Sequence, residues 1–397
     1  MTENESAQNL VIENAWIVPI AGEPFHGSLL VTDGKIADLG KKVKSPRGYE
    51  TVDADGGWVT PGLVDAHVHL GTHEEGEGWA GDDTNEKTDP VTAAVRALDA
   101  INPADVGFDD ALTGGVTTVN VNPGSANPIG GLAVAIKVHG RIVDEMVLRS
   151  PSGLKAALGE NPKRVYGEQK KTPATRLGTA YTIRKAFAEA QAWAERDEKE
   201  RGSHLVNEAL GMVLRREIPW RQHSHRADDI ATALRMADEF GYELVLDHGT
   251  EAYKIADVIA ERNVPVLCGP MIVSRSKAEV RGRSSKGPGI LAEAGVKVSI
   301  ITDHPVVPID FLIHQAALAV KEGMDPVEAL KAVTLNPAEV LGVADRVGSL
   351  EKGKDADLVL WDGDPLDTRS RALSTWIEGR EVYTYNQDTR EGTVVPR

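Results

Sequence analysis

In the segment Val59-Thr-Pro-Gly-Leu-Val-Asp-Ala-His-Val-His-Leu70, a Pro-Gly turn leads into a short apolar run, which is typical of a buried strand. Side chains alternate along a strand, so His67 and His69 face the same side, with Cα atoms about 7 Å apart. Two imidazoles placed in this way can bind one metal ion, provided that other segments supply further ligands.

Length, net charge and cysteine content limit the domain organisation and the kinds of partner that this chain can have. A chain of 397 residues exceeds the usual size of one core, which predicts a large barrel-type domain with a smaller unit. The formal net charge of −16 argues against nucleic acid and against a membrane surface as partners. The single cysteine, Cys268, excludes an intrachain disulfide and a thiolate zinc site. The N-terminal residues are polar and unlike a signal peptide, so we expect a cytoplasmic protein.

Both ends of the chain alternate apolar and polar residues in the manner of strands. Near the N-terminus these are residues 9–18 and 27–40, the second folded at Asp33-Gly34, and near the C-terminus they are residues 357–361 and 376–383, with a tight turn at Glu378-Gly379. The two ends are β-rich, whereas the middle of the chain alternates strands and helices. We therefore predict that residues 1–60 and 345–397 together form one small β-sandwich.

Between these ends, short apolar strands alternate with helical stretches, as in parallel βα units. We expect a TIM-like (β/α)8 barrel over residues 61–344. The second possibility is an open doubly wound sheet, but the glycine-rich dinucleotide-binding motif typical of that fold does not follow the first strand. A helix is also predicted to begin at a capping Asn336 with Pro337 at its first position. The expected strands are 63–69, 115–121, 132–136, 154–158, 220–223, 243–248, 265–267 and 296–301, and further helices are expected at 175–196, 226–240 and 252–262.

Chemistry in such barrels lies at the carboxyl ends of the strands. The polar residues directly after the apolar strands are histidines and carboxylates, the ligand set of a hydrolytic site for one or two divalent metal ions such as Zn²⁺. They are His67, His69, Glu160, His223, His225, His248 and Asp303.

The sequence resembles the amidohydrolase superfamily of metal-dependent hydrolases, near its imidazolonepropionase and prolidase-like members. The resemblance rests on motifs spread over nearly the whole chain in the family's order. These are Pro61-Gly-Leu-Val-Asp-Ala-His-Val-His69, Gln222-His-Ser-His-Arg-Ala-Asp-Asp-Ile230, Asp247-His-Gly249, Thr302-Asp-His304, Asn336-Pro-Ala and Gly348-Ser-Leu-Glu-Lys-Gly-Lys-Asp-Ala-Asp-Leu-Val-Leu360. The resemblance implies a distorted (β/α)8 barrel with a small sandwich made from both termini.

Carried over to this chain, the resemblance gives each strand-end residue a role. His67 and His69 match the metal ligands of the first strand, and His223 matches the ligand of the fifth. His248 matches the sixth-strand histidine, which binds a second metal or contacts substrate, and Asp303 matches the aspartate that binds metal and shuttles the proton. His225 is the rival of His223 and is otherwise expected to contact the substrate.

The ligand that bridges two metals departs from the simplest family pattern. Many relatives use a carbamylated lysine at the end of the fourth strand, and others use a glutamate. Glu160 is the preferred bridge here, because a carboxylate needs no modification to bind two cations. Lys155 and Lys137 remain the alternatives.

The resulting expectation is an enzyme that cleaves the C–N bond of a small amide, cyclic amide or dipeptide-like substrate. Arg164, Tyr166 and Arg176 are candidates for binding a substrate carboxylate, and the loops at 71–90 and 270–290 are expected to select the substrate. The alternatives are a non-catalytic binding protein on the same fold and a deaminase of heterocyclic rings. By analogy with relatives, a homo-oligomer is expected.

Overall fold

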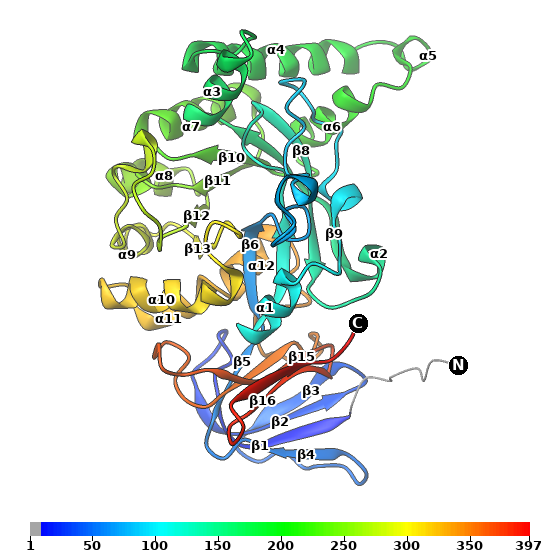
Figure 1. Ribbon diagram of the computed structural model, residues 1–397, viewed down its shortest axis with the longest axis vertical. Coiled ribbons are helices and arrows are strands. Elements are labelled where there is room, and N and C mark those ends of the chain that lie inside the picture. The colour runs from blue at the N-terminus through cyan, green and yellow to red at the C-terminus, as the bar shows by residue number, and fades with distance from the viewer. Residues whose placement is uncertain (1–8) are drawn as a thin grey trace.

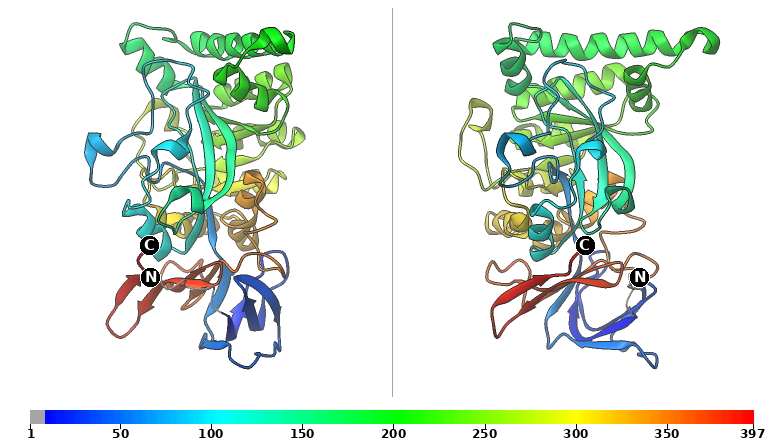
Figure 2. Two further views of the ribbon diagram at one scale, coloured as in Figure 1. Left: turned by 90° about the vertical axis from the view of Figure 1, so that its right-hand side faces the viewer. Right: turned by 45° about the vertical axis from the view of Figure 1, so that its right-hand side comes forward.

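The structure is a computed structural model that describes residues 9–397 (Figure 1). A β-rich unit holds segments from both ends of the chain, and an α/β unit holds the middle. The views of Figure 2 show the two units at opposite ends of an elongated molecule, with α4 farthest from the β-rich unit. The expected division into a barrel and a smaller sheet of both termini is confirmed, while the domain boundaries remain predictions.

The smaller unit is one continuous sheet in the order β17-β16-β15-β14-β5-β1-β2-β3, with β4 pairing β1. Its two halves join where β5 pairs with β1 on one side and with β14 on the other. The turn residues Asp33 and Glu378 both adopt positive φ, each followed by a glycine that does the same, which confirms the two predicted hairpins. The strands are β1 (Leu10–Ile17), β2 (Phe25–Thr32), β3 (Lys35–Gly40), β4 (Glu50–Asp53), β5 (Trp58–Pro61), β14 (Leu358–Trp361), β15 (Ala372–Ile377), β16 (Arg380–Asn386) and β17 (Glu391–Val394).

The larger unit contains an eight-stranded sheet in sequence order, which curls into a nearly closed barrel. The ends of the first and last strands meet through two backbone hydrogen bonds: Asp303 N–H donates to His67 O at 3.2 Å, and His69 N–H donates to His304 O at 2.9 Å. The first and last strand ends are therefore held side by side. The strands are β6 (Leu63–Val68), β7 (Val116–Val121), β8 (Ile129–Lys137), β9 (Val147–Ala157), β10 (Trp220–Ser224), β11 (Leu244–His248), β12 (Val266–Cys268) and β13 (Val298–Ile300).

One strand of the barrel departs from the expected parallel arrangement. β8 runs antiparallel to both β7 and β9. Only residues 122–128 join β7 to β8, and residues 138–146 join β8 to β9. A parallel connection needs a crossover of about a dozen residues or more, so these short links force an antiparallel meander. Each of the eight predicted strands exists, but the purely parallel pattern was wrong for β8.

The helices pack mainly around this barrel. Thr175 caps α4 as its side chain accepts from Gly178 N–H, and the predicted helix at 252–262 is divided into η3 and α8. The helices are α1 (Gly107–Thr113), α2 (Val143–Met146), α3 (Glu160–Glu168), α4 (Arg176–Ala194), α5 (Glu198–Arg201), α6 (Leu205–Leu214), α7 (Ala227–Phe240), α8 (Ala256–Glu261), α9 (Gly287–Glu293), α10 (Leu312–Lys321), α11 (Pro326–Lys331) and α12 (Leu335–Leu341). Single-turn 3-10 helices are η1 (Gly78–Gly81), η2 (Ala97–Ala100), η3 (Ala252–Ile255), η4 (Ala278–Val280) and η5 (Ile309–Phe311).

The start of α12 corrects the predicted cap. The helix begins at Leu335, and Thr334 rather than Asn336 is the N-cap residue. The Asn336 side chain donates to Val298 O of β13 at 2.8 Å, so it ties the helix to the barrel instead of capping it. Gly342 ends the helix in the left-handed region, which favours glycine.

Lys137 joins the two units at the end of the barrel away from the strand-end histidines. Its Nζ lies 3.0 Å from Asp355 Oδ2 and also contacts Asp357, and both carboxylates are buried. Because β8 is antiparallel, its last residue lies near the start of β7. Lys137 is thereby excluded as the bridging metal ligand.

Among the described residues, no helix combines the length and apolar character needed to cross a membrane. The cytoplasmic location and the homo-oligomeric state remain predictions.

Candidate functional site

The strand-end histidines and Asp303 converge at one mouth of the barrel. His67 lies within β6 and His69 just beyond it. His223 lies in β10 and His225 directly after that strand, and His248 is the last residue of β11. His248 and Asp303 both adopt positive φ, at 73° and 55°. Non-glycine residues enter this region at an energetic cost and tend to do so at functional sites. The backbone is thus turned sharply where these two side chains are placed.

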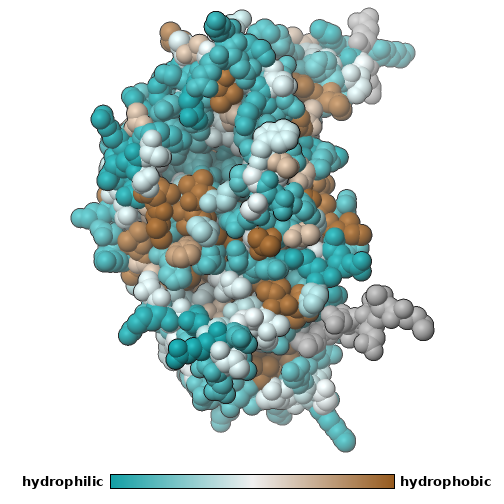
Figure 3. All heavy atoms as spheres, viewed as in Figure 1, coloured by the Kyte–Doolittle hydropathy of each residue, from teal (hydrophilic) through white to brown (hydrophobic). Residues whose placement is uncertain are grey.

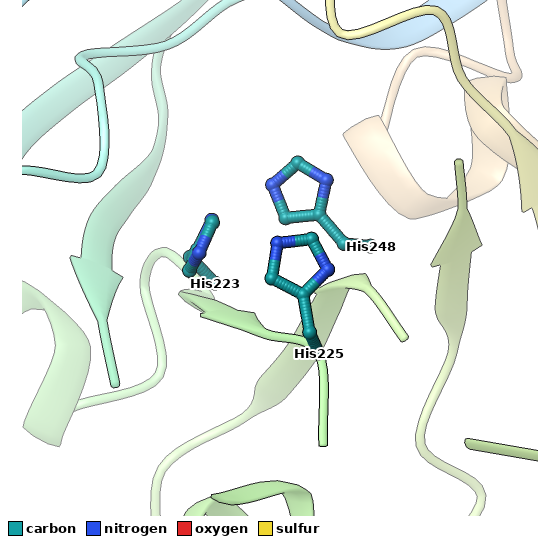
Figure 4. A group of neighbouring side chains, drawn as sticks. All are labelled: His223, His225 and His248. Atoms are coloured by element: carbon teal, nitrogen blue, oxygen red, sulfur yellow. The ribbon is translucent and has the colours of Figure 1, made fainter. Parts of the chain in front are cut away.

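Three imidazoles form the first group that fits a metal ion. The side chains of His223, His225 and His248 point toward one another in Figure 4, and one ring nitrogen from each lies within 4.8 Å of the others. Ring centroids are 4.7 Å apart for His223 and His225 and 4.5 Å apart for His223 and His248. His223 is buried, and neither of its ring nitrogens has a hydrogen-bond partner among the described residues. Unpaired buried nitrogens of this kind are what a metal ion would satisfy.

His248 also belongs to a second group, with His67 and Asp303. Asp303 Oδ1 lies 3.3 Å from His67 Nε2 and 3.4 Å from His69 Nε2. The other ring nitrogen of His69 contacts Asn122 O at 2.8 Å, and that of His248 contacts Gly269 O at 2.9 Å. These outer contacts orient both rings in the way common around metal-binding histidines.

Burial keeps the imidazoles in the form that binds metal. It lowers the pKa of His223 and His225 well below the usual value, and it lowers the pKa of His248 to about 3. A histidine must be neutral to donate its lone pair to a metal ion. At neutral pH all three rings are therefore ready to bind without releasing a proton.

Of the two remaining candidates for the bridging ligand, Lys155 rather than Glu160 lies beside the strand-end histidines. Lys155 Nζ is 3.1 Å from His67 Nε2 and 2.9 Å from Asp247 Oδ2, and the side chain is fully buried. Burial also lowers its pKa, although Asp247 opposes the shift. Glu160 begins α3 and donates its backbone N–H to Glu279 Oε2 at 2.9 Å. The structure does not bring the Glu160 side chain to the histidines.

Asp247 and Arg221 support His67 from inside the barrel. Asp247 Oδ2 lies 3.1 Å from His67 Nδ1, so the other nitrogen, Nε2, is left facing Asp303. Arg221 is fully buried, lies 3.4 Å from Asp247 Oδ1, and donates to Ala66 O at 2.6 Å. A Cβ at Gly153 would come within 2.6 Å of the Arg221 side chain, so this glycine leaves room for the arginine. The pair fixes the ring orientation of His67.

Replacing Asp247 with Asn is expected to lower the affinity of the protein for added Zn²⁺, used as a probe of the candidate metal site, about 10- to 100-fold, because a neutral amide cannot hold both the His67 ring and the Lys155 amine. Zinc affinity is measured by competition with a chromophoric chelator on folded protein, checked by circular dichroism. Asp229→Asn is the control, since Asp229 is another buried carboxylate but pairs with Arg176 at 2.9 Å. Equal zinc affinities in the two variants would contradict a positioning role for Asp247.

Three residues predicted to bind substrate have other surroundings. Arg164 is exposed on α3, and Arg176 pairs with Asp229. The Tyr166 hydroxyl is tied to Asp89 O at 2.7 Å and to Asn127 Oδ1 at 3.0 Å, so it anchors the loop at 71–90. None of the three lines the cavity at the histidines. The fourth predicted substrate contact, His225, does line it, with Nδ1 2.7 Å from Thr250 Oγ1.

The cavity over this cluster has a volume of about 400 Å³. Its walls include His73, Asp82, Thr84 and Asn85 from the loop at 71–90, and Val273, Lys277, Val280 and Arg283 from the loop at 270–290. Figure 3 shows hydrophobic residues gathered over the β12 side of this unit. Both loops predicted to select the substrate therefore contribute to the walls.

Sequence reasoning missed several polar residues around the site: Asp247, Arg221, Glu279 and Arg283. Glu279 is a buried carboxylate on η4, 3.6 Å from His225 Nε2 and 2.7 Å from Lys277 Nζ. Asp247 stands next to His248 at a strand end, which was a usable signal. The residues of the 270–290 loop gave none, because nothing in a loop's composition places its side chains.

The chain is similar to several known proteins over most of its length. A model of the Amidohydrolase family matches residues 58–385. Amidohydrolase tasK of Hapsidospora irregularis is 31% identical over 386 residues, 89% of this chain but 39% of that protein. Imidazolonepropionase of Mesorhizobium japonicum is 26% identical over 381 residues, 85% of this chain and 86% of that one. A solved amidohydrolase from Thermotoga maritima MSB8 has 47% identity and a TM-score of 0.91, covering 94% of this chain and 99% of that one.

Proposed function

Since this chain belongs to the Amidohydrolase family, we propose that it is a metal-dependent hydrolase that cleaves the C–N bond of a small amide, cyclic amide or dipeptide-like substrate. The observation that carries the proposal is the pair of ligand groups that share His248, one with His223 and His225 and the other with His67 and Asp303. Two groups with a common member suit one or two divalent ions, of which zinc fits the nitrogen-rich donor set best.

In this proposal His67, His69, His223, His248 and Asp303 would hold the metal, together with Lys155 in carbamylated form, while His225, the third member of the first group, would contact the substrate. Lys155 replaces Glu160 in this proposal because its Nζ lies 3.1 Å from His67 Nε2 and its side chain lines the cavity. When bound, a divalent ion acidifies a water molecule and polarises the scissile carbonyl.

The residues of the chain then move the proton. Asp303 takes the proton that the attacking water loses as its oxygen bonds to the carbonyl carbon, and returns it to the nitrogen when the C–N bond breaks. The position of Asp303 Oδ1, within 3.4 Å of two ligand nitrogens, supports this role. His248 belongs to both groups and lines the cavity, and with Nδ1 against Gly269 O its Nε2 is left to bind the metal.

Two other functions share the fold. A non-catalytic binding protein has no need of buried histidines without partners, so His223 argues against it. A deaminase would use the same metal chemistry on a ring carbon bearing an amino group. The buried carboxylate Glu279 lies 3.6 Å from His225, but it pairs with Lys277 and does not line the cavity, so it gives the deaminase little support.

Metal content measured by plasma emission spectrometry tests the proposal directly. Protein purified without chelators is expected to hold between one and two equivalents of zinc per chain, and to lose turnover when the zinc is removed. Turnover is measured on a panel of N-acyl amino acids, dipeptides and cyclic amides. Aminated heterocycles are included to test for deaminase activity. A metal-free protein that stays inactive after zinc is added would contradict the proposal.

A further inference from the structure

Arg283 is the one basic residue on the wall of the cavity that has no acidic partner among the described residues. Lys155 pairs with Asp247, and Lys277 lies 2.7 Å from Glu279 Oε1. The structure gives Arg283 no ion pair, although its side chain is partly buried on the 270–290 loop. An anionic group of a ligand binds favourably beside a partly buried positive charge that has no counterion, because it compensates that charge.

The acids that line the same cavity are already engaged. Asp82 accepts from Thr84 Oγ1 at 2.6 Å and lies 3.6 Å from His73 Nδ1. Asp303 contacts His67 and His69. Neither acid is paired with Arg283, so the charge of the arginine is left for a molecule that enters the cavity.

The guanidinium of Arg283 is held in place before any ligand arrives. One terminal nitrogen, Nη1, donates to the backbone carbonyls of Met271 and Val273. A guanidinium has five N–H groups, so three remain, on Nε and Nη2, which is the edge that binds a carboxylate with two parallel hydrogen bonds. A fixed arginine loses little entropy on binding.

Arg283 also lies close to the proposed reaction centre. It lines a small adjoining cavity together with His248, Thr250 and Pro270, and these three residues line the main cavity as well. A molecule of the size that fits about 400 Å³ can therefore contact Arg283 while its amide lies at His248. The apolar walls beside the arginine, Val273 and Val280, suit a side chain rather than a second charge.

We propose that Arg283 binds a free carboxylate of the substrate, so that the substrate class is an amide whose nitrogen or ring carries that carboxylate. N-acyl amino acids, dipeptides and carboxylated cyclic amides belong to this class. The proposal rests on the proposed hydrolase function. It replaces Arg164 and Arg176, the carboxylate-binding candidates of the sequence, with a residue that lines the cavity.

The test compares each substrate with its own carboxamide. The zinc-loaded enzyme is assayed on the best substrates of the panel, each as the free acid and as the C-terminal amide. Arg283→Gln is expected to lower kcat/KM about 10- to 100-fold for the acid, mainly through KM, and to leave the amide within about twofold. Arg281→Gln, an exposed arginine two residues away, is the control and is expected to change neither.

Two outcomes would overturn the inference: an equal loss on acid and amide, which indicates that Arg283 only holds the loop, or no loss on either. A binding measurement tests the carboxylate site of Arg283 independently of the proposed hydrolase function. If no panel member is hydrolysed, the hydrolase proposal fails, and calorimetric binding of N-acetyl-L-amino acids and their amides to the same proteins still tests Arg283. Weaker binding of the acids alone by Arg283→Gln supports the carboxylate site, and unchanged binding of the acids overturns it.

Discussion

Replacing Asp303 with Asn is expected to lower kcat by about 10³-fold while the protein stays folded. General acid–base catalysis by one positioned group contributes about 10²- to 10⁴-fold, and an amide cannot take up the proton of the attacking water. The Asn side chain keeps the size of the Asp, so the packing of the site against His67 and His69 is preserved. Steady-state kinetics on the panel substrates, with circular dichroism and zinc content on the same preparation, measure this change.

The control for Asp303 is Asp82→Asn. Asp82 lines the same cavity but contacts Thr84 and His73 instead of the central histidines. This variant is expected to keep kcat within about tenfold of the wild type, since a residue outside the reacting atoms contributes no proton transfer. Near-normal turnover by Asp303→Asn at full zinc content would show that another group moves the proton.

The strand-end histidines could be found from the sequence because two physical rules agree. Residues at i and i+2 of a strand share a face, and the carboxyl ends of barrel strands gather at one mouth. His67, His223, His248 and Asp303 each follow an apolar run, so the pattern needed no knowledge of loop structure. The hairpins at Asp33 and Glu378 were equally visible, because glycine follows each at a position of positive φ.

The choice between Lys155 and Glu160 could not be made in the same way. Both residues lie near the end of the fourth barrel strand, and strand ends are the least certain part of a sequence-based assignment. β9 ends at Ala157, and Gly159 then turns the chain at a φ of +87°, a backbone conformation that favours glycine. The turn carries Glu160 into α3 and leaves Lys155 as the last long side chain of the strand beside His67.

The direction of β8 and the location of the predicted carboxylate-binding arginines, Arg164 and Arg176, could not be obtained from the sequence for related reasons. The apolar run of β8 has the same composition as a parallel strand, and only the short connections reveal its direction. Arg164 and Arg176 follow the fourth strand closely in sequence, but α3 and α4 carry them away from the mouth. Arg283 reaches it from a loop more than a hundred residues later. Proximity in sequence is a poor guide to which loop residue faces a barrel mouth.

Replacing Lys155 with Ala is expected to reduce bound zinc to less than half of the wild-type content and to lower kcat by about 10³-fold. Its buried Nζ contacts His67 and Asp247, so a carbamate formed there from the neutral amine and CO₂, with release of one proton, would lie beside the proposed ligand His67. Burial lowers the pKa of Lys155, which favours the neutral amine that reacts. Zinc content by plasma emission and turnover on the panel are measured after purification with added bicarbonate.

The matched variant is Glu160→Gln, which changes the rival residue without altering its size and is expected to keep both zinc and turnover. A small carboxylic acid such as acetate or propionate is expected to restore part of the turnover of Lys155→Ala, because it can enter the space left by the side chain and supply the missing oxygens. A merely structural lysine would give no such rescue. Full zinc content in Lys155→Ala, together with loss of zinc in Glu160→Gln, would return the bridge to Glu160 and would require α3 to move toward the histidines when metal binds.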